Sequence, residues 1–310
     1  MSFDHKPVML REVIEYLECK ENGIYIDGTL GRGGHTEAVL NELSNTGRVI
    51  AIDRDITAIE EVKKKLGDIQ NLVLIHNNYV NIPDILEKAG ITAVDGMLFD
   101  LGVSSPQFDN PERGFSYNYN AALDMRMDQE ENQTAADIVN TYSFDELNRI
   151  IKEYGEEKWA SRIASFMVKF RAKKKIKTTF DLVELIKAAV PASARRSGGH
   201  PARRTFQALR IATNNELKQL EDMIEKVVPF LKKGGRICII SFHSLEDRIV
   251  KNKFRYLAKK CVCPPDFPVC VCNKRAELKI INTKPITAST EEISTNPRAR
   301  SAKLRVAEKR

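Results

Sequence analysis

The 310-residue sequence lacks any apolar run that approaches the roughly 18 residues needed to cross a bilayer. It also lacks internal repeats and extended low-complexity segments. Near the N-terminus, Asp4, His5 and Lys6 stand where a secretory signal peptide would have an apolar core. These absences exclude a membrane-spanning chain and a repeat protein, and we expect a cytosolic protein.

The composition is that of a globular protein with a basic surface. Hydrophobic residues make up 42% and charged residues 29% of the chain, which is long enough for two structural units. The net charge of +7 favours an anionic partner. Positive charge is concentrated at residues 169–177, 195–210 and 298–310. Each segment alone is equally typical of a solvated helix face or a frayed tail, but together they favour a phosphate backbone as partner.

The first hundred or so residues alternate between strand and helix patterns. Apolar runs typical of buried strands occupy residues 24–27, 48–53, 72–76 and 94–100. Segments with helical periodicity lie between them, at residues 36–43, 56–66 and 82–89. This alternation predicts an α/β fold with a parallel sheet covered by helices on both faces.

The pattern changes at about residue 107. Polar loop residues and then helical periodicity follow, at residues 144–153, 159–170 and 180–190. After this segment we expect an amphipathic helix at 216–231, closed by Gly234 and Gly235. A buried strand at 236–241 and a helix at 246–259 follow, and then strand-like runs at 278–281 and 302–307. We therefore expect a discontinuous α/β domain, residues 1–106 and 215–310, and a helical insertion, residues 107–214, that recognises substrate. The last two runs are expected to form an antiparallel hairpin at the sheet edge.

A glycine-rich segment, Asp27–His35 (DGTLGRGGH), joins the first strand to the first helix of this alternation. Glycines there allow the backbone to approach a ligand and to turn into the helix. Asp53 ends the next strand about 20 residues later, where an acid binds ribose hydroxyls. The spacing differs from the G-x-G-x-x-G of dinucleotide enzymes, and Asp27, Asp53 and Asp100 all end strands on one rim, which suits a sulfonium cofactor. The alternative is a plain turn with incidental glycines.

A second motif, Asp100–Gln107 (DLGVSSPQ), follows the fourth strand. Residues outside the carboxyl ends of parallel strands line the binding crevice of such folds. Methyltransferases that modify amino groups place an acid or amide at this location, followed by prolines and an aromatic residue. Such acceptors orient the amino lone pair toward the methyl carbon. A turn stabilised by serine and proline is the alternative.

Five strings carry a resemblance to a known family: GTLGRGGHTEAVL, DLGVSSPQFD with RGFSY and LDMRMD, HPARRTFQALRIATNNEL, SFHSLEDRIVK and NPRARSAKLRVAEK. The chain resembles the RsmH/MraW family from Phe3 to Lys309. Members of this family methylate N4 of a cytidine in the decoding region of bacterial 16S ribosomal RNA. The resemblance implies a class I (Rossmann-like) methyltransferase fold with an inserted helical domain. It also implies 16S rRNA or the small ribosomal subunit as partner, and S-adenosylmethionine as cofactor.

The resemblance also implies site residues. Cofactor contacts are expected from Gly33, Gly34, His35, Asp53, Tyr79, Asp100 and Gln107. Tyr79 would lie beside the adenine; without the family, half-buried packing is as good an interpretation. Ser104–Gln107 stands where amino methyltransferases in general have proline, proline and an aromatic. That departure leaves open whether Phe108 or Phe242 stacks on the cytosine.

Asp100 and His243 are the catalytic candidates. His243 follows the fifth strand, and we interpret it as a target-site contact, because a cationic amino product loses its proton readily to water. The neighbouring Ser244-x-x-Asp247 is predicted to cap the following helix.

Basic residues near the end of the insertion are candidates for RNA contacts. Arg203, Arg204 and Arg210 would hold RNA phosphates in a family member. Salt bridges to the body of the protein are the alternative for each of them.

Four cysteines stand close together in two C-x-C pairs, Cys261 with Cys263 and Cys270 with Cys272. They bracket a proline-rich loop with Pro264, Pro265 and Pro268. Four thiolates could hold a structural zinc ion, although C-x-C is tighter than the usual ligand spacing. The family's activity does not appear to depend on a metal. Free or redox-labile thiols are the alternative.

The sequence thus predicts a methyltransferase for a ribosomal cytidine. Two rivals are a methyltransferase for another amino substrate, such as DNA cytosine or adenine, and a non-catalytic RNA-binding or assembly factor that has kept the fold. The absent proline-proline-aromatic ending argues against the first, and the intact glycine loop with its acid partner argues against the second.

Overall fold

The computed structural model describes residues 6–196, 199–264 and 269–310. The chain divides into two compact units. We call Met1–Gly102 with Leu217–Arg310 the sheet unit, and Val103–Glu216 the helical unit. These bounds lie close to the expected interruption at residues 107–214. Within the described ranges, no helix is long and apolar enough to cross a membrane.

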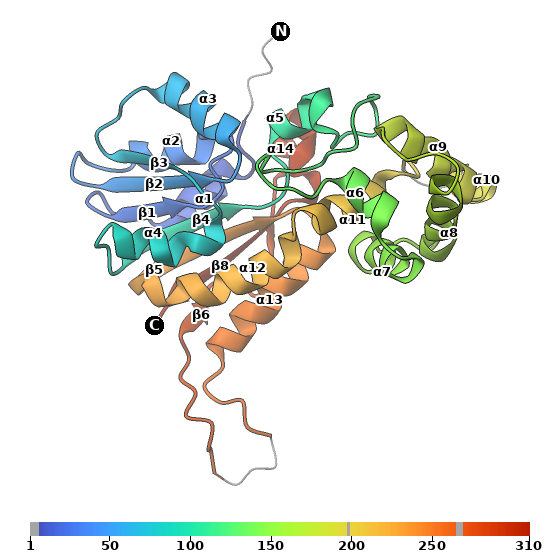
Figure 1. Ribbon diagram of the computed structural model, residues 1–310. Coiled ribbons are helices and arrows are strands. Elements are labelled where there is room, and N and C mark those ends of the chain that lie inside the picture. The colour runs from blue at the N-terminus through green and yellow to red at the C-terminus, as the bar shows by residue number, and fades with distance from the viewer. Residues whose placement is uncertain (1–5, 197–198, 265–268) are drawn as a thin grey trace. The chain divides into compact units, whose positions relative to one another are not determined.

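The sheet unit is built on one mixed sheet in the order β3-β2-β1-β4-β5-β8-β6, with β7 paired to β8 (Figure 1). The strands from β3 to β5 in this order are parallel, and β8 is antiparallel to β5, β6 and β7. The strands are β1 (Ile24–Asp27), β2 (Arg48–Asp53), β3 (Leu72–His76), β4 (Val94–Asp100), β5 (Leu231–Ser241), β6 (Leu278–Ile280), β7 (Ile286–Thr287) and β8 (Lys303–Lys309). The predicted bounds of the first four strands are confirmed.

Helices cover both faces of this sheet because successive strand residues point to opposite sides. Ile50 and Ile52 share a buried cluster with α4, α12 and α13, whereas Val49 and Ala51 pack with α1, α2 and α3. The helices of this part of the chain are α1 (Leu10–Leu17), α2 (Gly34–Asn41), α3 (Ile56–Leu66), η1 (Tyr79–Asn81), α4 (Ile82–Lys88), α12 (Glu216–Val227), η3 (Val228–Phe230), α13 (Ser244–Ala258), α14 (Thr290–Thr295) and η4 (Pro297–Ser301). The predicted α/β fold is confirmed.

The start of β5 corrects the sequence analysis. The helix predicted to run to residue 231 ends at Val227, and β5 already begins at Leu231. Pro229 has no backbone N–H, so the helix cannot continue through it. Gly234 and Gly235 therefore do not end a helix. They lie where the pairing with β4 is irregular, and Gly234 has a φ of 78°.

The C-terminal strand pairs on both sides. β6 and β8 are antiparallel, as predicted, but β8 also pairs with β5 and thus lies inside the sheet. Arg305 on β8 is only 6% exposed, and its Nε lies 2.6 Å from Oδ1 of Asp247. The interpretation of residues 298–310 as a frayed tail is therefore wrong for this strand, and Arg305 is a structural residue.

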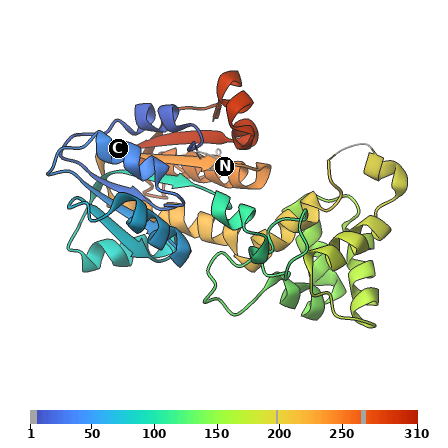
Figure 2. The ribbon, with the colours of Figure 1, turned by 90° about the horizontal axis from the view of Figure 1, so that it is seen from above.

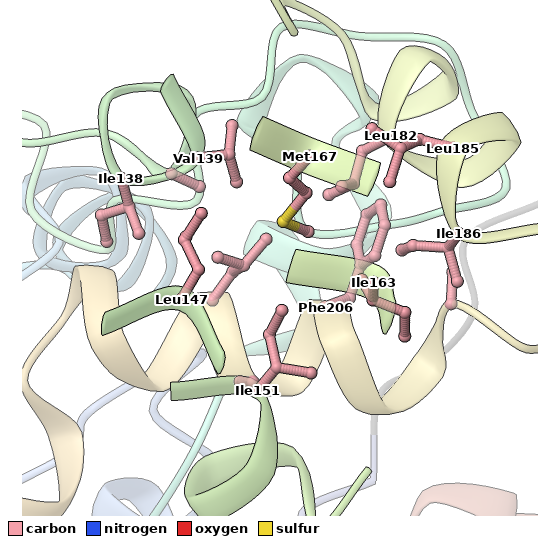
Figure 3. Close-up of a cluster of buried hydrophobic side chains, with 14 of the residues drawn as sticks. Ile138, Val139, Leu147, Ile151, Ile163, Met167, Leu182, Leu185, Ile186 and Phe206 are labelled. Atoms are coloured by element: carbon pink, nitrogen blue, oxygen red, sulfur yellow. The ribbon is translucent and has the colours of Figure 1, made fainter. Parts of the chain in front are cut away.

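The helical unit has its own hydrophobic core. Ile138, Leu147, Ile163 and Leu182, from four different helices, meet in one buried cluster together with Phe206 of α11 (Figure 3). In Figure 2 these helices are the green to yellow ribbons. They are α5 (Ser105–Asp109), η2 (Pro111–Arg113), α6 (Ala135–Thr141), α7 (Phe144–Gly155), α8 (Ala160–Arg171), α9 (Thr179–Ala189), α10 (Ala192–Arg196) and α11 (Arg203–Thr213).

Capping boxes fix where several of these helices begin. Thr134 with Asp137, Ser143 with Glu146, and Thr178 with Asp181 form reciprocal side-chain to backbone pairs at the starts of α6, α7 and α9. The helical periodicity read from the sequence in this region therefore corresponds to helices with defined ends.

Candidate active site

Three carboxylates lie at one edge of the sheet. Asp27, Asp53 and Asp100 are the last residues of β1, β2 and β4, and β1 is paired on one side to β2 and on the other to β4. The strands are parallel, so their carboxyl ends share an edge, where ligands bind in open α/β sheets. The strand pattern of the sequence predicts this common edge.

Two of these carboxylates organise the glycine-rich loop. Asp53 accepts hydrogen bonds from the backbone N–H groups of Gly31 (2.8 Å) and Asp55 (2.9 Å). Asp27 accepts from the backbone N–H of Thr29 (3.1 Å) and from the hydroxyl of Thr36 (2.7 Å). Each ionised carboxylate has about four lone-pair sites. Asp53 therefore keeps acceptor capacity for ligand hydroxyls while it holds the loop.

The glycines of the loop serve different purposes. Gly33 precedes α2 with a φ of 74°, a conformation that side chains with a Cβ rarely adopt. A Cβ on Gly34 would lie 2.2 Å from Cγ of Pro7, and one on Gly28 would lie 2.3 Å from the ring of Phe99. Packing within the protein thus requires glycine at positions 28 and 34. The sequence alone suggested close approach of a ligand as the reason for these glycines.

The environment of these acids raises their pKa values. Burial raises the pKa of Asp27 to about 6, against the opposing effect of its bonds from Thr36 and Thr29. Burial also raises the pKa of Asp53. For Asp100, burial raises the pKa well above its ordinary value, and the nearby charges of Asp27 and Glu246 raise it further. Asp27 and Asp100 form no salt bridge with a lysine or arginine among the described residues, and such acids favour a positively charged ligand.

One carboxylate oxygen of Asp100 has no hydrogen-bond partner among the described residues. Its Oδ1 is buried and accepts no hydrogen bond from any residue that the structure describes. Its Oδ2 lies 3.9 Å from Nδ1 of His35, and Nε2 of His35 lies 3.0 Å from the carbonyl of Val8. The backbone N–H of Asp100 donates to the hydroxyl of Thr29 (2.6 Å), which joins β4 to the glycine-rich loop. A buried carboxylate oxygen without a partner marks a position where a ligand N–H or O–H can bind.

His243 caps α13. It is the N-cap residue, and the backbone N–H of Glu246 donates to its Nδ1 (3.4 Å). Glu246 in return accepts from the backbone N–H groups of Phe242 (2.8 Å) and His243 (3.3 Å). The predicted cap at Ser244 with Asp247 is wrong by one residue, and the helix begins at Ser244. The imidazole nitrogen provides the acceptor that serine was expected to provide.

Glu246 is a site residue that the sequence analysis missed. It is 2% exposed, and its Oε1 lies 3.2 Å from Nε2 of His243. Its charge contributes to the raised pKa of Asp100, so it lies close to the edge that carries the acids. The available signal was a glutamate three residues after a histidine that closely follows a buried strand, which is capping-box spacing with an unusual first residue.

Tyr79 and Gln107, both expected to contact the cofactor, fall in different units. Tyr79 begins η1, with two residues between it and the end of β3, and is half-buried. Its ring packs edge-to-face on Phe99, with 6.1 Å between the ring centres. Gln107 belongs to the helical unit, where it is 3% exposed and its Oε1 accepts from the backbone N–H of Ser104 (3.1 Å). All predicted cofactor contacts except Gln107 therefore belong to the sheet unit, and so does His243.

The arginines of α11 separate into two kinds. Arg210 forms a two-point ion pair with Glu216, at 2.9 Å for both bonds. Its expected role on RNA phosphates is therefore corrected to a structural one. Arg203 and Arg204 are exposed, and neither pairs with a carboxylate among the described residues. Arg204 instead donates to the carbonyl of Glu156 (3.2 Å).

The cysteine pairs converge in the sheet unit. The sulfur atoms of Cys261, Cys263, Cys270 and Cys272 all lie within 4.8 Å of one another. Pro265 and Pro268, two of the prolines between the pairs, fall outside the described residues.

The cap on α13 gives a testable prediction. His243→Ala removes the acceptor for the backbone N–H of Glu246 and should lower the free energy of unfolding by about 0.5–2 kcal/mol. His243→Asn is the matched control, because asparagine is a good N-cap residue and should stay close to the wild type. Urea unfolding followed by circular dichroism measures both. Equal losses for the two variants would contradict a capping role.

Comparison with known proteins agrees with this geometry. The model of the MraW methylase family matches residues 2–310. The ribosomal RNA small subunit methyltransferase H of Halothermothrix orenii is 65% identical over 306 residues, which cover 99% of this chain and 98% of that protein. The protein of the same name from Clostridioides difficile is 53% identical over 310 residues and covers 100% of both chains. The chain therefore belongs to the MraW methylase family and is an S-adenosylmethionine-dependent methyltransferase of the class I fold.

Proposed function

We propose that this enzyme transfers the methyl group of S-adenosylmethionine to N4 of a cytidine in the decoding region of small-subunit ribosomal RNA. The observation that carries the chemistry is the buried Oδ1 of Asp100, an acceptor without a partner at the carboxyl end of β4. The substrate class follows from relatives named for small-subunit ribosomal RNA, which match this chain along nearly its whole length.

The sheet edge fits the cofactor. S-adenosylmethionine supplies a methyl group on a positively charged sulfur. Asp53 would accept from the ribose hydroxyls with its remaining lone pairs, and Tyr79 would lie beside the adenine. The loop at Gly33 and Gly34, together with the start of α2 at His35, would complete the cofactor contacts. The buried acids would provide the negative field that a sulfonium requires.

Asp100 would position the target amine. The N4 lone pair of cytosine is conjugated with the ring and is therefore a weak nucleophile. A hydrogen bond from the amino group to Oδ1 of Asp100 would orient this nitrogen and draw its lone pair out of conjugation. The cationic product then loses a proton to water, so no base is needed. His243 acts as a positioning residue that holds Glu246 and the start of α13.

The helical unit would bind the RNA. Arg203 and Arg204 are exposed on α11, in a stretch without acidic residues from Arg195 to Arg210. Guanidinium groups of this kind form charge-assisted bonds with phosphates. Gln107 would add a cofactor contact from this unit, and Phe108 and Phe242 are the candidates to stack on the cytosine.

The reaction can be tested directly. The enzyme is incubated with labelled S-adenosylmethionine and, in separate reactions, with naked 16S rRNA, assembled small subunits and DNA. Nucleosides are then released and analysed by mass spectrometry. Label in N4-methylcytidine from either RNA substrate supports the proposal. Label in DNA, or in another ribonucleoside only, contradicts it.

The first prediction concerns Asp53. Asp53→Ala should weaken S-adenosylmethionine binding by about 1–3 kcal/mol, because the ribose hydroxyls lose a charged acceptor. Asp84→Ala, an exposed acid on α4, is the matched control and should leave the affinity unchanged. Titration calorimetry measures both, and an unchanged affinity in Asp53→Ala would remove this residue from the site.

The second prediction concerns pH. A bound cation favours ionised carboxylates, so binding releases protons and affinity rises with pH. Below the Asp27 pKa of about 6, S-adenosylmethionine affinity should fall by up to about tenfold per pH unit. The demethylated product S-adenosylhomocysteine has a neutral sulfur and should respond less. Calorimetric titrations from pH 5 to pH 8 compare the two ligands, and identical profiles would argue against a sulfonium held by the acids.

The third prediction concerns RNA. Replacing both Arg203 and Arg204 with alanine should weaken RNA binding and flatten its salt dependence by up to about two units of slope. Lys63→Ala with Lys64→Ala, on α3, makes the same change in net charge and is the control. Salt titrations of RNA binding are measured together with cofactor affinity, which should stay constant. A slope equal to that of the wild type would assign these arginines to structure.

A further inference from the structure

The chain also carries a set of four cysteines, Cys261, Cys263, Cys270 and Cys272, which we call the four-cysteine cluster. It lies in the segment between the end of α13 at Ala258 and the start of β6 at Leu278 (Figure 1). The capped start of α13 is next to the carboxyl edge of the sheet, and the helix is about 22 Å long. The cluster follows the C-terminal end of this helix, and none of its cysteines takes part in the proposed methyl transfer.

The sulfur atoms have the spacing of a tetrahedral metal site. Sulfur-to-sulfur distances are 3.5 Å for Cys261 and Cys270, 3.6 Å for Cys270 and Cys272, 3.7 Å for Cys261 and Cys272, and 4.0 Å for Cys263 and Cys270. Zinc–sulfur bonds of about 2.3 Å place the corners of a tetrahedron about 3.8 Å apart. A disulfide requires about 2.05 Å, so these thiols are not paired with one another.

Hydrophobic burial does not hold these sulfurs together. Val262, Val269 and Val271, which alternate with the cysteines, are 42%, 70% and 65% exposed. Cys261 and Cys270 are exposed as well, and the described residues around the cluster form neither helix nor strand. Ordering such a segment costs conformational entropy, and a metal ion bound to four ligands can offset that cost.

Backbone N–H groups are directed at the sulfur atoms. The N–H of Val262 points to Cys272, that of Val271 to Cys263, and that of Cys263 to Cys261, each at 3.4 Å. Such bonds stabilise thiolates, the form that binds metals.

From this geometry we propose that the four-cysteine cluster binds one zinc ion through all four sulfur atoms. Four protein ligands leave no open position on the metal, which is the arrangement of structural rather than catalytic zinc. The ion holds together the two described stretches that carry the cysteine pairs, residues 261–263 and 270–272. Methyl transfer does not pass through it.

The test begins with metal content. Protein purified without chelator under reducing conditions should contain about one zinc per chain by elemental analysis. Cys261→Ala with Cys270→Ala should contain none. Cys19→Ala, which replaces a cysteine outside the cluster, should retain one. Circular dichroism of each variant shows whether the fold is kept.

Thiol reactivity of the wild type gives a reading that does not depend on any variant. Four thiols should resist alkylation until a chelator removes the metal, and zinc should be released in the same step. Protein that contains no metal and takes up none from added zinc would overturn the proposal. So would disulfides within the cluster in protein prepared under reducing conditions, and one equivalent of iron would overturn the assignment to zinc.

Discussion

The site depends on one constraint: Asp27 is buried and Asp100 half-buried at the edge of a parallel sheet, and neither forms a salt bridge with a lysine or arginine among the described residues. The fold creates this constraint, because β1, β2 and β4 end side by side and each ends in an aspartate. Burial disfavours their ionised forms, most strongly at Asp100, where Asp27 and Glu246 add like charge. A cationic ligand offsets the cost of ionising these acids, so the same residues favour a sulfonium cofactor.

The surrounding structure keeps these acids in place. Asp27 and Asp53 hold the glycine-rich loop through backbone N–H groups, and Thr29 joins that loop to β4. On the other side, the reciprocal bonds between His243 and Glu246 fix the start of α13. Gly28 and Gly34 permit close packing against Phe99 and Pro7. The edge is therefore assembled within the sheet unit, from contacts that include several between residues far apart in the sequence.

The sequence predicted the elements whose pattern is local. β1 to β4 were found with their observed bounds, because each is an apolar run that ends in or beside polar residues. The start of β5 was missed, since paired glycines resemble a helix end although Pro229 had already stopped the helix. The cap was placed at Ser244 because histidine is an uncommon N-cap residue. The burial of Glu246 and the pairing of Arg210 with Glu216 depend on tertiary packing, and the convergence of four sulfurs depends on the path of a loop. Spacing alone does not reveal these.

The central claim is that the aspartates at the sheet edge have raised pKa values that the cofactor lowers. Carbon-13 NMR of labelled aspartate carboxyl groups measures these pKa values directly. In the free enzyme, Asp27 should titrate near pH 6 and Asp100 well above the ordinary range for an aspartate. Both pKa values should fall when S-adenosylmethionine binds, and should fall less with S-adenosylhomocysteine. Ordinary aspartate pKa values in the free enzyme, or values that the sulfonium leaves unchanged, would contradict the account.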